Sequence, residues 1–133
     1  AADDMKARFG VTTEGDDGST EDLKTALAEG SEVILACAAA GRRVLSADNL
    51  RNCRNLLVAG DVNAVPPLGV EGVELFDNGK PIGYGQAVGL GALAIGNVKY
   101  QTQSGLFRKM IESGEILTLD FRDAYELAKT IDT

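Results

Sequence analysis

Two predominantly hydrophobic runs stand out in the first half of the chain, at residues 33–40 and 55–62. Neither run alternates between apolar and polar positions, as a half-exposed strand does. Such continuous runs are typical of parallel strands covered by helices on both faces. Ser46 is suited to cap a short helix near residues 47–52, which would connect the two strands. The pattern therefore predicts a crossover between parallel strands and an α/β sheet.

The residues before the first strand carry the stop signals of two helices and the start signal of the second. Residues 2–9 predict a helix that stops at Gly10, and Ser19 predicts the N-cap of a second helix that stops at Gly30. Between these helices, residues 11–14 are rich in β-branched side chains and predict a short strand.

A hairpin is predicted after the second hydrophobic run. The Asn78-Gly79 pair, a strong turn signal, lies between the short apolar segments 73–76 and 80–82. Residues 72–84 are therefore interpreted as an inserted β-hairpin. An exposed ribbon of this kind can serve as an interface between copies of the chain, so a homo-oligomer stays an alternative.

The last part of the chain predicts one more strand and two helices. Residues 87–96 supply the strand and its turn, and residues 98–113 a helix before Gly114. The final helix covers residues 120–131, with Asp120 at its start and apolar side chains along one side.

Composition predicts a single domain over residues 1–133. The 44% hydrophobic content suffices for a core, and no apolar run is long enough to cross a membrane. The start of the chain lacks the basic-then-apolar order of a secretory signal, so a cytoplasmic protein is expected. With 13 basic and 20 acidic residues, the formal charge of −7 opposes binding to nucleic acids and anionic membranes.

The chain has no histidine and two cysteines, Cys37 and Cys53. Neither a zinc site nor a Cys-His nucleophile can be assembled from these residues, so no metal and no catalytic residue is predicted. Both thiols are interpreted as buried or half-buried in a reducing compartment.

Residues 89–94 fit the G-x-G-x-x-G/A fingerprint of dinucleotide-binding folds through Gly89, Gly91 and Ala94. That fingerprint requires a strand directly before it, and residues 84–86 are a weak strand. Asp120 could contact a ribose, but its role as a helix N-cap competes with that interpretation.

A cofactor site is expected instead at the carboxyl ends of the buried strands, where open α/β sheets bind their ligands. The turn 38–41 offers small side chains, Asn63 offers a planar donor and acceptor, and the loop 89–96 offers backbone amides. These features suit a nicotinamide with its carboxamide. The alternative is that the small residues only allow close packing of strands and helices.

Three segments also resemble those of a known family. Residues 36–41 match an Ala-rich turn; Asp61, Asn63, Ala64, Pro66, Pro67 and Gly69 match an Asp-x-Asn-Ala-x-Pro-Pro-x-Gly segment; and Gly91, Ala92, Leu93, Ile95 and Gly96 match a Gly-Ala-Leu-x-Ile-Gly segment. Over nearly its whole length the chain resembles the C-terminal part of the NADP-dependent methylene-tetrahydromethanopterin dehydrogenases, which also use or discriminate methylene-tetrahydrofolate.

The resemblance implies a partial Rossmann-like, doubly wound domain that binds the nicotinamide half of NADP and transfers hydride to or from a reduced pterin in one-carbon metabolism. The cofactor-binding residues that we expect are Ala38, Ala39, Gly41, Asn63, Pro66, Gly89, Gly91, Ile95 and Gly96. Hydride transfer needs positioning of two rings rather than acid-base chemistry.

The family's glycine-rich loop, its first βαβ elements and its separate pterin-binding domain would precede residue 1. The chain is therefore expected to be a fragment that is inactive by itself. A non-catalytic nucleotide-binding or interaction module, a remnant that folds against another chain, and a different Rossmann enzyme such as a shikimate-dehydrogenase-like protein remain alternatives. The preference for NADP comes from the resemblance alone, and the choice between the two pterins stays open.

Overall fold

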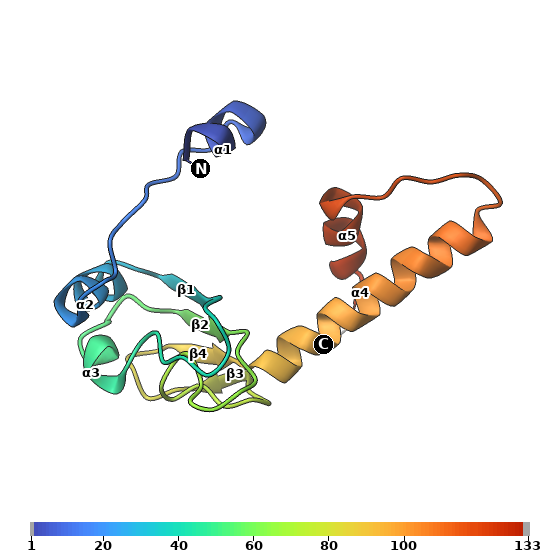
Figure 1. Cartoon of the computed structure of the whole chain (residues 1–133). Coiled ribbons are helices and arrows are strands. Elements are labelled where there is room, and N and C mark those ends of the chain that lie inside the picture. Colours follow the sequence, from blue (N-terminus) through green and yellow to red (C-terminus); the bar gives the residue numbers. More distant parts are fainter. Residues whose placement is uncertain (1, 132–133) are drawn as a thin grey trace.

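The computed structural model describes residues 2–131 and contains one mixed four-stranded sheet with the strand order β1-β2-β4-β3 (Figure 1). Strands β1 (Val33–Ala36), β2 (Val58–Asp61) and β4 (Val88–Leu90) are parallel, whereas β3 (Asn78–Pro81) is antiparallel to β4. The predicted α/β class is confirmed, and β3 corrects the expectation of an all-parallel sheet. Residues 1, 132 and 133 of the predicted domain lie outside the described residues.

Within residues 2–131, five helices accompany the sheet, and their bounds are α1 (Ala2–Phe9), α2 (Glu21–Glu29), α3 (Ala47–Leu50), α4 (Ala92–Glu112) and α5 (Phe121–Ala128). The prediction of α1 is confirmed. It ends at Gly10, which has a φ of 69° and donates its amide to the Lys6 carbonyl oxygen. Ser46 caps α3, as predicted, in a reciprocal pair with Asn49.

Two predictions near the start of α2 are wrong. The N-cap is Thr20, whose hydroxyl accepts the Leu23 amide at 3.3 Å, because the Ser19 hydroxyl donates to Asp17 instead. Residues 11–14 form no strand, since they lie in an exposed connection between α1 and α2 with no strand beside them.

The structure contains a hairpin, but it is not the predicted one within residues 72–84. β3 pairs with β4 rather than with residues 73–76, and the connection runs through residues 82–87. Gly79 has a φ of 77° inside β3, where the register shifts between Asn78 and Lys80. The Asn78-Gly79 pair thus makes a β-bulge, which needs the same left-handed glycine as a turn.

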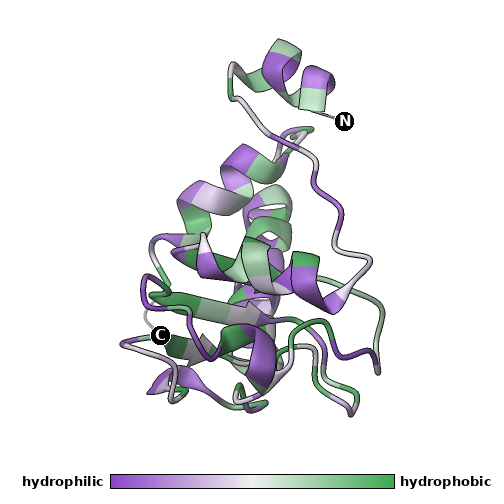
Figure 2. Cartoon of the chain, turned by 90° about the vertical axis from the view of Figure 1, so that its left-hand side faces the viewer, coloured by the Kyte–Doolittle hydropathy of each residue, from purple (hydrophilic) through white to green (hydrophobic). Residues whose placement is uncertain are grey.

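One face of the sheet is covered by α2, α3 and the loops that follow β1 and β2. Ala36 and Ala59 point to this face and pack with Ala28, Leu50 and Leu56 in the hydrophobic core. Figure 2 shows hydrophobic residues concentrated along the strands, while the helices alternate between hydrophobic and hydrophilic positions.

The opposite face of the sheet is largely bare within the described residues. On β1, Val33 and Leu35 are 57% and 65% exposed, and Val58 and Leu90 are half-buried. Of α4, Ile95 reaches this face and lies near Gly60. Helices therefore cover one face of the strands, not both, because α4 leaves the sheet as a long arm (Figure 1).

The arm carries α5, which packs against the second half of α4. A Cβ on Gly105 of α4 would lie 2.7 Å from a methyl of Leu127, so the glycine allows the two helices to approach closely. Asp120 is the N-cap of α5 in a capping box with Asp123, which confirms its structural role. The ring of Phe9 meets that of Phe121 edge-on, so α1 also touches the arm.

Candidate functional site

The carboxyl ends of the three parallel strands meet at one edge of the sheet, beside the beginning of α4 (Figure 1). The loop after β1 covers residues 37–44, and the loop after β2 covers residues 62–69. Both loops were predicted to carry the site, and the register of the strands brings them side by side.

Asn63 connects the two loops. Its side chain is 6% exposed, and its carbonyl oxygen accepts the amides of Gly41 at 3.1 Å and Val65 at 2.9 Å. Its NH₂ group donates to the Pro67 carbonyl oxygen at 2.9 Å. The predicted donor and acceptor are thus occupied within the protein, and Asn63 holds the loops in place rather than projecting a free amide.

Three of the predicted site residues come together around this amide. Gly41 has a φ of 73°, and a Cβ on it would lie 3.6 Å from the carbonyl oxygen of Pro66. The Gly41 backbone therefore lies against both the Asn63 side chain and the Pro66 carbonyl group. Its positive φ is a left-handed conformation that favours glycine.

Ala38 and Ala39 are exposed at the tip of the loop after β1, where their small side chains leave the backbone accessible. Cys37 precedes them and is also exposed, so its predicted burial is wrong. The hydrophobic run extends to residue 40, but β1 ends at Ala36, and Cys37 lies beyond the core. Cys53 is buried, as predicted.

The segment 89–96 is not a loop. Gly89 lies in β4, Gly91 is the N-cap of α4, and the helix begins at Ala92 rather than at residue 98. The Gly91 amide donates to the Asp77 carbonyl oxygen at 2.8 Å, and the Leu93 amide donates to that of Leu75 at 2.9 Å. The prediction that this segment exposes its amides is therefore wrong for these two groups.

The G-x-G-x-x-A match has the strand, glycine and helix that the fingerprint requires. A Cβ on Gly91 would nevertheless lie 2.0 Å from the Glu74 carbonyl oxygen, so the protein's own chain fills the space at this helix start. Gly91 is needed for packing against residues 74–77, and a pyrophosphate would have to displace them.

Ile95 and Gly96 lie in the first turns of α4. Ile95 lines a hollow of about 210 Å³ together with Leu90 and Ala94, at the carboxyl end of β4. A Cβ on Gly96 would meet no atom within 4 Å. The hollow is smaller than the ~300–1,000 Å³ of a typical ligand pocket, so it fits one ring or ribose rather than a whole dinucleotide.

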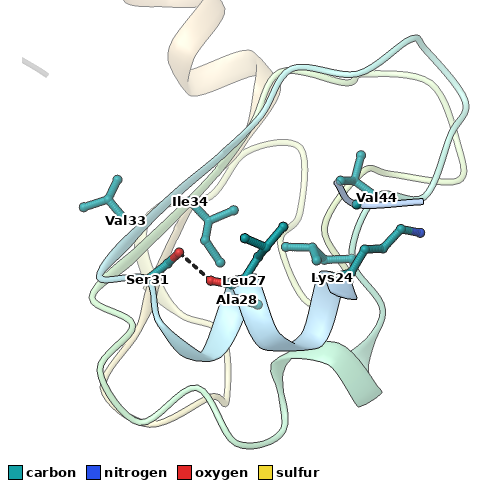
Figure 3. Close-up of a pocket in the computed structure, with 9 residues that line it drawn as sticks. Lys24, Leu27, Ala28, Ser31, Val33, Ile34 and Val44 are labelled. Atoms are coloured by element: carbon teal, nitrogen blue, oxygen red, sulfur yellow. Dashed lines mark hydrogen bonds between the residues drawn. The ribbon is translucent and has the colours of Figure 1, made fainter. Parts of the chain in front are cut away.

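A larger cavity of about 300 Å³ lies away from this edge, between α2 and the start of β1 (Figure 3). Leu27 and Ala28 of α2 face Ile34 of β1 across it, and Lys24 lies at its rim. Its lining is apolar and includes none of the predicted site residues.

One of the two arginines near the candidate site forms an ion pair within the protein. The Arg43 guanidinium lies 2.8 Å from the carboxylate of Glu71, which follows the loop after β2. Arg42 is exposed beside it. Within residues 2–131, no cluster of three or more His, Cys, Asp or Glu side chains is arranged to hold a metal ion.

Sequence reasoning overlooked the site residue with the strongest contacts, Asp61. Its carboxylate is 2% exposed and accepts the backbone amides of Asn63 at 2.9 Å and Val70 at 3.1 Å. The signal was an acidic residue at the end of an otherwise apolar run, because a carboxylate in such a place must find hydrogen-bond donors.

No helix in the described part of the chain is both long and apolar enough to span a membrane. Comparison with models of known protein families found no match.

Two curated relatives resemble almost the whole chain. The NAD(P)-dependent methylenetetrahydromethanopterin dehydrogenase of Methylorubrum extorquens is 49% identical over 127 residues, which are 96% of this chain and 43% of that protein. The bifunctional protein MdtA of the same organism is 30% identical over 129 residues, which are 97% of this chain and 44% of that protein. The chain spans less than half the length of these relatives and is homologous to that part of the dehydrogenase.

Proposed function

From this homology to an NAD(P)-dependent methylenetetrahydromethanopterin dehydrogenase, we propose that the chain forms part of an oxidoreductase that uses NADP and a methylene-pterin. The pterin is methylene-tetrahydromethanopterin or methylene-tetrahydrofolate, and hydride passes between its methylene carbon and the nicotinamide. The 49% identity over 127 residues carries this proposal. The same relative favours this activity over the alternative of a different Rossmann dehydrogenase.

The residues at the carboxyl edge fit the nicotinamide end of such a cofactor. Ala38 and Ala39 are small and exposed, Gly41 is held by Asn63, and Ile95 lines the hollow at the end of β4. Bound there, the nicotinamide supplies or accepts the hydride. The chain's own residues exclude water from one side of the ring and fix its orientation, which is the contribution that hydride transfer needs.

The residues that we propose for the cofactor site are Ala38, Ala39, Gly41, Asn63, Pro66, Gly89, Gly91, Ile95 and Gly96. Gly89 and Gly91 are buried, so they act by letting β4 and the start of α4 pack closely against residues 73–82. Asn63 acts by holding the Gly41 turn.

The bare face and edge of β1 support a doubly wound sheet that is larger than the one described. Among residues 2–131, no strand pairs with the edge of β1 that faces away from β2, and Leu35 on the bare face is 65% exposed. Exposed apolar edges of this kind promote association. We propose that a further strand and a helix of the same enzyme, outside this chain, complete the sheet here.

Replacement of Asn63 by Ala in the full-length enzyme tests the proposed site. The variant leaves the Gly41 and Val65 amides without their acceptor, so the KM for NADP is expected to rise by about tenfold. Asn49→Ala is the matched control, because Asn49 is equally buried but connects α3 to α2.

The wild-type enzyme should reduce NADP with a methylene-pterin. Failure of the wild-type protein to do so with either pterin would overturn the proposed activity. If the wild-type enzyme turns over while Asn63→Ala has an unchanged KM and kcat, the activity stands and the proposed site is wrong.

A further inference from the structure

Asp61 ends β2 at the edge where the candidate site lies. It pairs in register with Ala36 of β1, and its side chain points to the covered face of the sheet. Within residues 2–131, no basic side chain forms an ion pair with it. A buried carboxylate without a cation requires hydrogen bonds from other groups. Here the donors are two backbone amides.

These two amides belong to the two ends of one loop. One carboxylate oxygen accepts the Asn63 amide at 2.9 Å, and the other accepts the Val70 amide at 3.1 Å. A single side chain therefore fixes both the first residues of the loop after β2 and the residue at which that loop ends. Hydrogen bonds to a charged acceptor are stronger than those to a neutral one, so the loop is held firmly.

Gly69 shows how tightly the loop is wrapped around this carboxylate. A Cβ on Gly69 would lie 2.7 Å from one oxygen of Asp61 and 3.2 Å from its carboxyl carbon. The Gly69 carbonyl oxygen accepts the amides of Val44 at 2.7 Å and Leu45 at 3.0 Å. The close approach thus extends the connection to the end of the loop after β1.

Asp61 consequently reaches the loop after β1 by two routes. One passes through Asn63 to the Gly41 amide, and the other passes through Gly69 to Val44. We propose that Asp61 is a positioning residue that fixes the loops after β1 and β2 in the arrangement that receives the nicotinamide end of NADP. This inference rests on the proposed function, and Asp61 itself is not placed in contact with the cofactor.

Asp77 provides a comparison within the same fold. It is also buried, but its oxygens accept the Glu74 amide at 2.8 Å and lie 3.2 Å from the Lys80 ammonium. Its side chain therefore holds the turn before β3 and touches neither loop of the candidate site. Asp61 and Asp77 are both buried carboxylates, but of these two only Asp61 is connected to both loops.

The test uses Asp61→Asn and Gly69→Ala in the full-length enzyme, with steady-state kinetics for both substrates. In Asp61→Asn, an NH₂ group replaces one of the two accepting oxygens. One backbone amide then loses its acceptor and faces another donor. In Gly69→Ala, the new methyl pushes the carboxylate away. Both variants should raise the KM for NADP about tenfold or more and change the KM for the pterin less than twofold.

A merely structural role gives a different kinetic result. If a variant only unfolds more easily, a smaller fraction of the enzyme is active. The apparent kcat then falls, and both KM values stay unchanged. Asn49→Ala measures this effect, because Asn49 is a buried polar residue that contacts neither loop. An unchanged KM for NADP in both Asp61→Asn and Gly69→Ala, in an active wild-type background, would overturn the inference and leave the proposed function standing.

Hydrogen exchange gives a second measurement that does not depend on turnover. In Asp61→Asn, the amide of Gly41 should exchange about tenfold faster or more, while the amides of α2 keep their rates. If Gly41 exchanges at the wild-type rate, Asp61 does not act on the loop after β1. If the wild-type enzyme is inactive but the Gly41 amide exchanges faster in Asp61→Asn, then the proposed function is wrong and the role of Asp61 in holding the loop stands.

Discussion

Gly91 is the residue at which the structure leaves least room for a side chain. A Cβ at this position would lie 2.0 Å from the carbonyl oxygen of Glu74 and 2.4 Å from that of Leu75. Both atoms belong to the backbone, so no change of rotamer can relieve the clash. The Gly91→Ala variant must therefore move the segment 74–77 or the start of α4.

The magnitude follows from the contacts that such a movement breaks. The Gly91 amide donates to Asp77 at 2.8 Å and the Leu93 amide donates to Leu75 at 2.9 Å. A buried backbone group left without a partner costs about 1–3 kcal/mol. Gly91 is buried, whereas Leu93 is exposed, so only the Gly91 amide counts as a buried group. With this group unpaired and about 1–3 kcal/mol of overpacking strain, we expect Gly91→Ala to lower the free energy of unfolding by about 2–5 kcal/mol. That is a large part of the ~5–15 kcal/mol of a whole domain.

Gly96→Ala is the matched control, because Gly96 lies in the same helix. A Cβ at Gly96 would meet no atom within 4 Å. Alanine is the better helix former by about 1 kcal/mol, so this variant should be more stable than the wild-type chain by about 0.5–1 kcal/mol. The same substitution in one helix is thus expected to change stability in opposite directions.

Urea unfolding followed by far-ultraviolet circular dichroism measures both variants. The midpoint should fall for Gly91→Ala and rise for Gly96→Ala, with similar slopes. A Gly91→Ala variant within about 1 kcal/mol of the wild type would show that the segment 74–77 does not lie against the start of α4.

Two further predictions concern titratable groups. The hydrogen bond from Arg122 lowers the pKa of Asp120 from 3.8 to about 2. The stabilisation by this carboxylate is present above its unfolded pKa near 4 and lost as the pH falls towards 2. Carboxyl NMR titration should show the pKa returning towards 3.8 in Arg122→Gln, and an unchanged pKa would exclude this cause. Iodoacetamide should label the exposed Cys37 in the native chain but not Cys53, since burial raises the pKa of the Cys53 thiol. Equal labelling of both in peptide mass spectra would contradict this.

The strands β1 and β2 and several helix ends could be predicted because their signals are local. A continuous apolar run, a capping side chain or a final glycine acts within a few residues, as for Ser46 and Gly10. The error at Ser19 has the same local origin. Its hydroxyl binds Asp17, and the neighbouring Thr20 takes over the cap.

The hairpin could not be placed because strand pairing is not local. The Asn78-Gly79 pair correctly indicates a left-handed backbone, but a turn and a bulge need the same conformation. A turn forms if the segments on the two sides of the glycine pair with each other, whereas a bulge forms if both sides belong to one strand. Gly79 lies within β3, which pairs with β4 after residue 87, so the outcome depends on a strand pairing that the local sequence does not specify.

The sequence could predict that the loops after β1 and β2 meet at one end of the sheet, but not which contacts their residues make. The carboxyl ends of the strands follow from the order of elements, and Gly41, Asn63 and Pro66 do meet there. The roles of Asn63 and Gly91 depend on which backbone groups face them after folding. Residue type alone does not tell whether an amide binds a ligand or another loop.

In the proposed site, Asp61 explains how these loops keep their arrangement although they bury few of their side chains. A loop that binds a ring must keep its shape without burying much of its own surface, and exposed Ala38 and Ala39 provide no packing to fix it. The buried carboxylate and the amide of Asn63 supply that rigidity from beneath, through hydrogen bonds to backbone groups. Small side chains above and buried polar side chains below are then two requirements of the same binding edge, because the first leaves room for a ligand and the second keeps that room open.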